Sequence, residues 1–329
     1  MQNMKTLVTG ATGFVGSNLV EELISQGFEV RVLVRKTSKL DHLSGLKIEI
    51  CYGDINDFDS VCQAVRGVDY VFHVAGVIFP RSRSDFFRIN EEGARNVIRA
   101  AAQENSGIKR FVLISSMAAG GPVDSLNPRT ESQPDQPVSD YGRSKLAAES
   151  ALLPFCSKVP ISIVRPPIIY GPRDSGVLTL VKMVASRLMI FVKGNSPDGK
   201  KYYSMIHVKD LCRGLIQVAV AKSDQVKSGE IFYLSGDDYA SFESWLDEMA
   251  SCLDRKPFKI YISPRVVVFF GKILNFLGMN VDKLNEILPD YWICSNEKAR
   301  RLLNFKPEYD LRRGTADAIQ WYKKNQWIR

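Results

Sequence analysis

Tyr141 and Lys145 are the residues of this 329-residue sequence whose types and spacing point most directly to chemistry. They lie four positions apart in Tyr-Gly-Arg-Ser-Lys, and on a helix this spacing places both side chains on one face. An ammonium group beside a phenol is expected to lower the pKa of the phenol from its ordinary value of about 10. A phenol altered in this way exchanges protons near neutral pH. The spacing is also common on solvated helix faces, so its meaning depends on the rest of the sequence.

A glycine-rich loop near the N-terminus is the second such feature. The apolar run at 5–9 predicts a short buried strand, and a helix is predicted from Ser17 to Gln26. Between them lies Gly-Ala-Thr-Gly-Phe-Val-Gly, residues 10–16. Glycines at a strand-to-helix turn let the backbone approach a pyrophosphate, which then faces the unpaired N–H groups of the helix. The order of strand, loop and helix therefore predicts a nucleotide site rather than only a tight turn.

The glycine loop and the Tyr/Lys pair together define a resemblance to a known family. Gly-x-x-Gly-x-x-Gly followed by Tyr-x-x-x-Lys resembles the extended short-chain dehydrogenase/reductases, also described as the NAD-dependent epimerase/dehydratase family. Further motifs in the order of that family span nearly the whole chain: Gly53-Asp54-Ile55, His73-Val74-Ala75-Gly76, Ile114-Ser115-Ser116 and the segment from Arg165 to Arg173. The resemblance implies an NAD(P)-dependent oxidoreductase.

The pattern of elements predicts an α/β fold with a Rossmann doubly wound parallel sheet and a smaller, mostly C-terminal substrate-binding lobe. Strand and helix patterns alternate through about residue 170, and 45% hydrophobic composition supports a large core. We expect the NAD(P)-binding domain to comprise residues 1–170 and about 204–235. The substrate-binding lobe would comprise about 171–203 and 236–329, so that the two are interleaved.

The end of the second predicted strand bears on the choice of cofactor. An NAD site usually offers a carboxylate about 20 residues beyond the glycine loop, whereas an arginine accommodates a 2′-phosphate. Arg35 occupies this place, and Lys36 and Lys39 add positive charge. NADP(H) is therefore favoured, with NAD(H) as the alternative. The expected cofactor-binding residues are Gly10, Thr12, Gly13, Phe14, Val15, Gly16, Arg35, Lys36, Lys39, Asp54, Ile55, Val74, Ala75, Gly76, Tyr141, Lys145, Pro166, Ile168 and Ile169.

The resemblance also implies a catalytic hydroxyl. Ser115 and Ser116 follow a predicted strand at its carboxyl end, where ligands bind in open α/β sheets. Ser116 precedes Tyr141 by 25 residues, as in the family, and is preferred over Ser115. In reduction, Ser116 would orient the carbonyl, Tyr141 would donate the proton, and Lys145 would bind the ribose and stabilise the tyrosinate. Asn90 would support the helix and a water relay, or be purely structural.

The substrate is less clearly indicated. Nucleotide-sugar members of the family typically carry Asn where this chain has Ile168, and the Arg-Pro-Pro-x-x-Tyr-Gly-Pro form resembles the dihydroflavonol 4-reductase and 3β-hydroxysteroid dehydrogenase branch. The leading prediction is hydride transfer to or from the carbonyl or alcohol of an apolar small molecule. The alternatives are a nucleotide-sugar epimerase or dehydratase with tightly bound NAD(P), and a non-catalytic dinucleotide sensor.

Two further stretches bear on the substrate pocket. The loop at 77–83 is predicted to roof the nicotinamide site, and its Arg81 and Arg83 either hold an acidic group or, more commonly, are solvated. The apolar stretch at 266–277 is too short to span a membrane, which takes about 20 residues. We expect it to pack against the core or to wall the pocket; contact with a membrane surface is the minor alternative. Segments 296–303 and 321–329 predict amphipathic surface helices.

Composition excludes several other classes of protein and site. The six cysteines are scattered without a Cys-x-x-Cys pair, and His73 and His207 sit among apolar residues, so neither a disulfide framework nor a metal site is predicted. The net charge of +8 is dispersed and lacks an aromatic-interleaved patch, which argues against nucleic acid. A secretory leader is not expected because the first strand begins within a few residues, so a cytoplasmic location is predicted. The sequence leaves a homodimer open.

Overall fold

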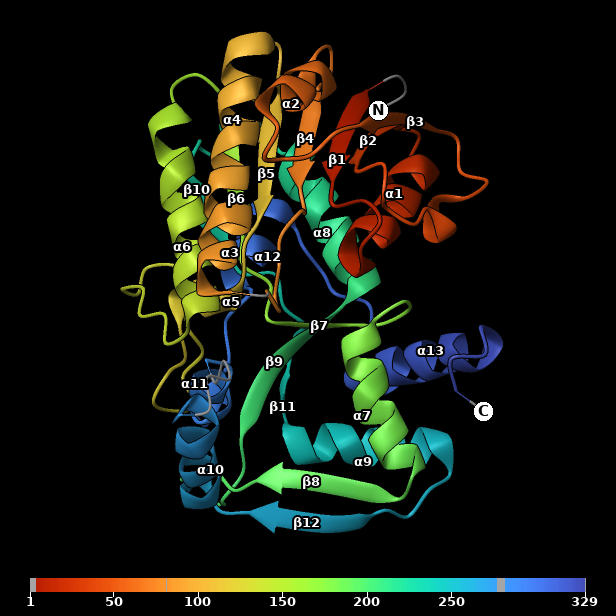
Figure 1. The fold of residues 1–329 in the computed structure, drawn as a ribbon, viewed down its shortest axis with the longest axis vertical. Helices are drawn as coiled ribbons and strands as arrows, with labels where there is room; N and C mark the ends of the chain where they lie inside the picture. Colours follow the sequence, from red (N-terminus) through yellow and green to blue (C-terminus); the bar gives the residue numbers. More distant parts are fainter. Residues whose placement is uncertain (1–3, 81, 277–281, 329) are drawn as a thin grey trace.

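The centre of the molecule is a parallel seven-stranded sheet in the order β10-β6-β5-β4-β1-β2-β3 (Figure 1). The computed structural model describes residues 4–80, 82–276 and 282–328. The sheet comprises β1 (Lys5–Thr9), β2 (Glu29–Val34), β3 (Ile48–Tyr52), β4 (Tyr70–His73), β5 (Arg110–Ile114), β6 (Ile161–Val164) and β10 (Glu230–Phe232). The strand order reverses between β1 and β4, which are neighbours. The predicted α/β doubly wound fold is confirmed.

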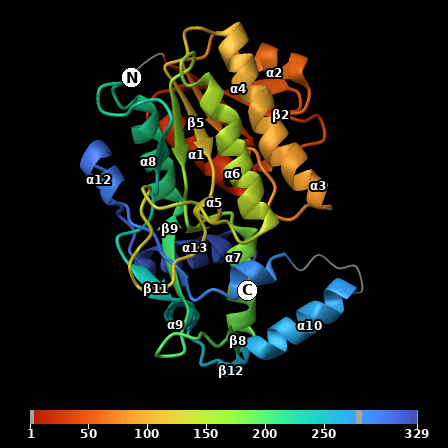
Figure 2. The same ribbon diagram turned by 90° about the vertical axis from the view of Figure 1, so that its left-hand side faces the viewer.

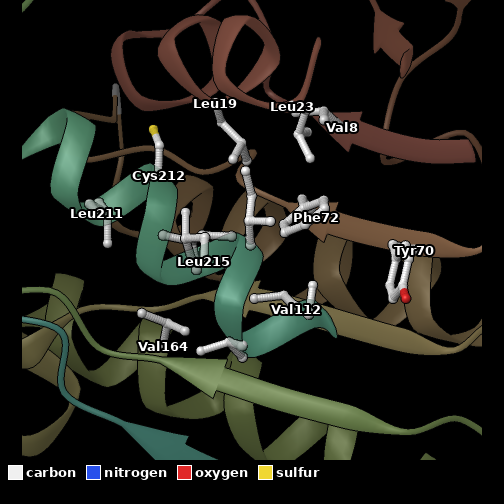
Figure 3. Close-up of a cluster of buried hydrophobic side chains, with 14 of the residues drawn as sticks. Val8, Leu19, Leu23, Tyr70, Phe72, Val112, Val164, Leu211, Cys212 and Leu215 are labelled. Carbon is white, nitrogen blue, oxygen red and sulfur yellow. The ribbon is translucent and has the colours of Figure 1, made fainter. Parts of the chain in front are cut away.

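Two layers of helices cover the sheet. One layer contains α1 (Phe14–Ser25) and α8 (Val208–Val220), whose apolar side chains meet strand residues such as Phe72 (Figure 3). The other contains α2 (Phe58–Val65), α4 (Gly93–Glu104) and α6 (Asp140–Leu152). Because both faces are covered, the inner strands are almost wholly apolar and buried. The residues free to make polar contacts are therefore those at the strand ends.

A second lobe is built around β9 (Tyr202–His207). This strand pairs with β7 (Ile168–Tyr170), β11 (Tyr239–Ser241) and β13 (Tyr291–Trp292). The lobe also contains α7 (Ser175–Ala185), β8 (Leu188–Val192), α9 (Phe242–Leu253), β12 (Phe258–Ile262) and α13 (Leu311–Lys324). The chain returns to the large sheet through α8 and β10 before it completes this lobe. The exact boundaries given above stay a prediction.

Short elements connect these parts. They are η1 (Asp41–Leu43), α3 (Arg83–Phe86), the π-helical turn η2 (Phe87–Glu92), α5 (Met117–Gly120), η3 (Leu153–Phe155), α11 (Leu284–Ile287) and α12 (Glu297–Leu303). The C-terminal helix α13 begins well before the predicted residue 321, because the Asp310 side chain caps it by accepting a hydrogen bond from the Arg313 amide. Arg81, Leu277 and Arg329 lie outside the described residues.

The helix α10 (Pro264–Phe276) does not pack as predicted. Val266, Phe269 and Phe270 are 44%, 61% and 57% exposed, and residues 264–270 belong to none of the apolar clusters of the described chain. The expectation of core packing was wrong for these residues because α10 lies at the end of the second lobe remote from the large sheet (Figure 2). Among the helices that the structure describes, none has the length and apolar content needed to cross a bilayer.

Candidate active site

The glycine loop forms one wall of a cleft at the carboxyl edge of the sheet. Gly10 follows β1 with φ +71°, a conformation that favours glycine, and Gly13 directly precedes α1. A Cβ at Gly10 would lie 2.6 Å from the Ala75 amide nitrogen, and a Cβ at Gly16 would overlap the Gly10 carbonyl. The loop therefore has room only for hydrogen at these positions. The N-terminus of α1 is left open toward the cleft, as a phosphate site requires.

The cleft has a volume of about 700 Å³ and collects most of the predicted cofactor residues. All of them line it except Lys36 and Lys39. Those two side chains are exposed and do not line the cleft, so their part in cofactor binding stays a prediction. Arg35 does line the cleft, beside Ser38, which the sequence reasoning missed. Val77 and Ile78, from the loop predicted to roof the nicotinamide site, also line the cleft. Further lining residues outside the expected cofactor set are Leu33, Val34, Gly53, Asn56, Arg88, Ile89, Ile114, Ser115, Pro167 and Asp174.

The helix α6 brings Tyr141 and Lys145 to the cleft. Ser139 caps this helix by accepting a hydrogen bond from the Gly142 amide, which places Tyr141 in its first turn. Both Tyr141 and Lys145 line the cleft, and the Lys145 ammonium donates to the Ile114 carbonyl at 2.8 Å. Helical spacing thus places the two residues on one side of α6, as expected.

The protonation behaviour of Tyr141 differs from the expectation. Burial raises the pKa of Tyr141 to about 12, although a hydrogen bond with Ser116 favours the phenolate. The nearby carboxylate of Glu286 raises the pKa of Tyr141 further. Burial also lowers the pKa of Lys145 to about 8, against the opposing effect of Glu149. In the free protein, removal from water therefore has the largest effect on the pKa of Tyr141, which is a neutral phenol at pH 7.

The two serines after β5 have different surroundings. Ser116 lines the cleft, caps α5 by accepting from the Ala118 amide, and is hydrogen-bonded to Tyr141. The Ser115 side chain is buried and donates to the Glu149 carboxylate. Ser116 is thus the hydroxyl that interacts with Tyr141, whereas the hydroxyl of Ser115 donates its hydrogen bond to Glu149.

Asn90 links the cleft loop to α6. Its side-chain oxygen accepts from the Val77 amide at 2.8 Å, and its side-chain nitrogen donates to the Ser144 hydroxyl at 2.9 Å. Asn90 is buried within the π-helical turn η2. The described contacts therefore hold the loop after β4 against the helix that carries Tyr141 and Lys145.

Ion pairs of the buried Arg165 side chain hold α6 in place. Arg165 donates to Glu149 at 2.9 Å and 2.5 Å and to Asp135 at 2.6 Å and 2.8 Å. The side chains of Arg165 and Glu149 are only 1% and 4% exposed. Glu149 lies one helical turn after Lys145, so its charge favours the ammonium form of that residue. The sequence reasoning did not identify this network, although Arg165 opens a motif that it used.

Residues preceding and within α11 contact the first turn of α6. The Asp282 carboxylate accepts from the Asp140 amide at 2.8 and 2.9 Å, and Glu286 accepts from the Ser139 hydroxyl at 2.5 Å. The Lys283 ammonium lies 4.6 Å from the centroid of the Tyr141 ring. These contacts join segments about 140 residues apart, and no local motif signals them. The second lobe therefore contacts Tyr141, the candidate proton donor, directly.

Gly16→Ala tests the steric limits of the loop. The methyl group would overlap the Gly10 carbonyl, so we expect a loss of about 1–3 kcal/mol in the free energy of unfolding and weakened dinucleotide binding. Gly13→Ala is the matched variant, because its Cβ would meet the Gly10 carbonyl only at 3.4 Å. It should fold normally. Denaturant unfolding of both proteins makes the comparison, and equal stability would contradict it.

The geometry defines a class of protein. A doubly wound sheet carries a glycine loop at its reversal point, and a Tyr/Lys pair lies in the same cleft. This is the arrangement of an NAD(P)-dependent oxidoreductase of the short-chain type. Residues 6–234 match the model of the NAD dependent epimerase/dehydratase family. The chain belongs to this family, and hence to the extended short-chain dehydrogenase/reductases.

Known proteins resemble this chain over nearly its full length. The chain is 28% identical to sterol demethylase protein B of Methylococcus capsulatus, over 99% of this chain and 100% of that protein. It is 28% identical to ceramide reductase of Caulobacter vibrioides, over 98% of this chain and 95% of that protein. The crystal structure of gox2253 superposes with a TM-score of 0.84 at 25% identity, covering 98% and 99% of the two chains.

Proposed function

We propose that the protein transfers hydride between a nicotinamide cofactor, with NADP(H) favoured, and the carbonyl or alcohol of an apolar small molecule. The observation that carries this proposal is that Ser116, Tyr141 and Lys145 line the same cleft as the glycine loop. A site for proton exchange and a site for a dinucleotide thus share one cavity. The open N-terminus of α1 supports the dinucleotide, because residues 13–16 line the cleft where its unpaired N–H groups can meet phosphates.

Each residue of the site has a role in the reaction that follows from its chemistry. The nicotinamide supplies or accepts the hydride when it is bound. Ser116 orients the substrate oxygen, and Tyr141, with a pKa raised to about 12, holds a proton that it can donate in the reducing direction. Lys145 contacts the nicotinamide ribose and stabilises the tyrosinate left after proton transfer. Arg165 and Glu149 keep α6 in place during this step.

Lys145 predicts a pH dependence for cofactor binding. Its pKa, lowered to about 8 in the free protein, means that the ammonium form is populated below about pH 8 and is lost above it. Binding that needs the ammonium must then take up a proton, so affinity should fall by up to about tenfold per pH unit above pH 8. Fluorescence titration with NADPH between pH 7 and pH 10 measures this. Lys145→Met should remove the dependence; an identical profile in that variant would contradict the assignment.

The NADP(H) preference is assigned to Arg35, which lines the cleft just after β2. Arg35→Ser should weaken NADPH binding by about 1.5–3 kcal/mol, the value of a hydrogen bond to a charged group. This corresponds to about tenfold to hundredfold. NADH binding should change little, because NADH lacks the 2′-phosphate. Lys47→Ser is the matched control, since Lys47 is exposed and does not line the cleft. Equal losses for both cofactors would contradict the role of Arg35.

Apolar lining supports an apolar substrate. Ile168 stands where a sugar-binding Asn is usual, and Val77, Ile78 and Pro167 line the same cleft. An aliphatic side chain cannot supply the hydrogen bonds that a sugar hydroxyl loses on leaving water. Two full-length relatives named for sterol demethylation and for ceramide reduction are consistent with an apolar substrate class.

A substrate panel tests the proposal. The protein is mixed with NADPH or NADP and either ketosteroid and flavanone-like carbonyls or nucleotide sugars. Net NADPH oxidation with the first panel is expected. The runner-up is an epimerase or dehydratase, a reaction that the family description includes. Turnover confined to the nucleotide sugars, without net cofactor consumption, would overturn the proposal in favour of that runner-up. Dinucleotide binding without turnover of either panel would indicate a sensor instead.

A further inference from the structure

The surface formed by β12 and α10 exposes large apolar side chains at one end of the molecule. We call the exposed side chains of residues 258–270 the distal surface. Half of the large apolar side chains that are exposed in the described part of the chain lie on β8, β12 and α10. The most prominent are Phe258, 72% exposed, Phe269, 61% exposed, and Phe270, 57% exposed. Gathered apolar surface of this kind usually marks an interaction site.

The shape of this end suits a flat partner. Figures 1 and 2 place α10, β8 and β12 at the end of the molecule opposite the outer tips of the large sheet and its helices. α10 has 13 residues, about 20 Å of helix, which is too short to cross a bilayer. A short helix with exposed phenylalanines can lie in the plane of a membrane, with its apolar side chains among the lipid headgroups and upper chains.

The charge around the distal surface selects the kind of partner. Residues 255–281 contain five Lys or Arg and no Asp or Glu. Arg255, Lys256 and Arg265 are exposed, whereas Lys259 pairs with Glu243 and Asp247. Exposed cations beside apolar side chains complement an anionic lipid surface. A second copy of this chain would bring the same cations together across a two-fold contact, and such like charges repel.

The distal surface is connected to the active-site cleft. α10 is followed, after residues 277–281, by Lys283, whose ammonium lies 5.5 Å from the Phe79 ring centroid and 4.6 Å from that of Tyr141. Phe79 is 78% exposed, and the neighbouring Ile78 lines the cleft. A short chain segment therefore separates the exposed apolar residues from the proton donor.

From these observations we propose that the protein docks on anionic phospholipid bilayers through the distal surface. α10 lies in the headgroup region, and Arg255, Lys256 and Arg265 contact lipid phosphates. Docking stands on the exposed side chains and their charge alone. One consequence rests on the function proposed above: docking brings the protein to the bilayer in which an apolar carbonyl substrate dissolves.

Vesicle sedimentation tests the docking with the full-length protein. We expect it to sediment with phosphatidylcholine vesicles that contain phosphatidylglycerol, and less with phosphatidylcholine alone or at high salt. Phe269→Ser combined with Phe270→Ser should lower the partition coefficient at least about tenfold. Tyr52→Ser combined with Leu153→Ser is the matched control, because these apolar residues are 53% and 51% exposed on the other lobe. It should bind like the unmodified protein.

The basic residues have their own test. Arg255→Gln with Lys256→Gln should remove most of the preference for anionic vesicles, whereas Lys222→Gln with Lys227→Gln, also exposed, should keep it. Failure of the unmodified protein to sediment, or equal sedimentation of the double-serine variant at 269 and 270, would overturn the proposal. A third result would also overturn it: neither protein binds vesicles, and analytical ultracentrifugation shows that the unmodified protein is a dimer whereas the double-serine variant is a monomer.

Reduction of a water-soluble ketone separates the two proposals. The double-serine variant at 269 and 270 should keep the turnover of the unmodified protein, because these residues lie outside the cleft. Vesicle binding without ketone turnover by the unmodified protein would retain docking and reject the proposed function. Ketone turnover without vesicle binding would retain the proposed function and reject docking.

Discussion

A Tyr141→Phe variant should lose about two to four orders of magnitude in kcat, the usual contribution of a positioned general acid. The substitution removes only the hydroxyl that hydrogen-bonds with Ser116 and leaves the ring between Phe86 and the Lys283 ammonium. Dinucleotide affinity should stay within a few-fold, because the glycine loop and Lys145 are unchanged. Single-turnover kinetics with bound NADPH separate the chemical step from binding.

Tyr70→Phe is the control for this experiment. Tyr70 is also buried, but it lies at the amino end of β4, away from the carboxyl ends of the strands where the cleft opens. Its removal should leave kcat unchanged. Substantial turnover by Tyr141→Phe, with the hydride-transfer step still rate-limiting, would show that another group supplies the proton. Weakened NADPH binding with normal kcat would likewise contradict the role of Tyr141.

Arg165→Met should destabilise the protein by about 3–5 kcal/mol, the usual effect of removing one partner of a buried ion pair. Methionine fills much of the same space but leaves the Glu149 carboxylate, 4% exposed, without its cation. The same charge then lies one turn from Lys145 without Arg165 to offset it. We therefore expect the Lys145 pKa to rise, and the alkaline loss of cofactor affinity to move to higher pH.

Arg66→Met provides the comparison. Arg66 also donates twice to one carboxylate, that of Glu104, but its side chain is 62% exposed. Because water screens such a pair, the loss of stability should be much smaller than that of Arg165→Met. Denaturant unfolding of both variants measures the difference. Similar stabilities would mean that the Arg165 network contributes little to α6, and its support of Lys145 would have to be abandoned.

The large sheet was predictable because each of its signals is local. An apolar run, a glycine turn and an amphipathic helix lie within about 20 consecutive residues at the N-terminus, and their order alone favours a doubly wound fold. Covering both faces with helices requires strands that are almost wholly apolar, which the sequence shows directly. α10 was predicted wrongly for the opposite reason. The apolar residues at 266–270 resemble those of a core helix, and only their position in the second lobe reveals that Val266, Phe269 and Phe270 are exposed.

The candidate site was predictable in its types of residue but not in their energetics. The spacing of Tyr141 and Lys145 predicted a shared face of α6, and both residues line the cleft. The spacing also suggested that the ammonium would lower the pKa of the phenol. Whether attraction or burial dominates depends on all the atoms around both groups, and burial dominates in the free protein.

The sequence by itself determined the family, the sheet, the glycine loop and the helix that carries Tyr141 and Lys145, because those features depend on residues close together in the chain. The tertiary structure alone decided which groups surround them. Glu286 reaches Ser139 across 147 positions, and Arg165, just after β6, reaches Asp135 in a loop and Glu149 on α6. Such contacts depend on how the lobes pack, and the packing energy is summed over many residues rather than encoded in one motif.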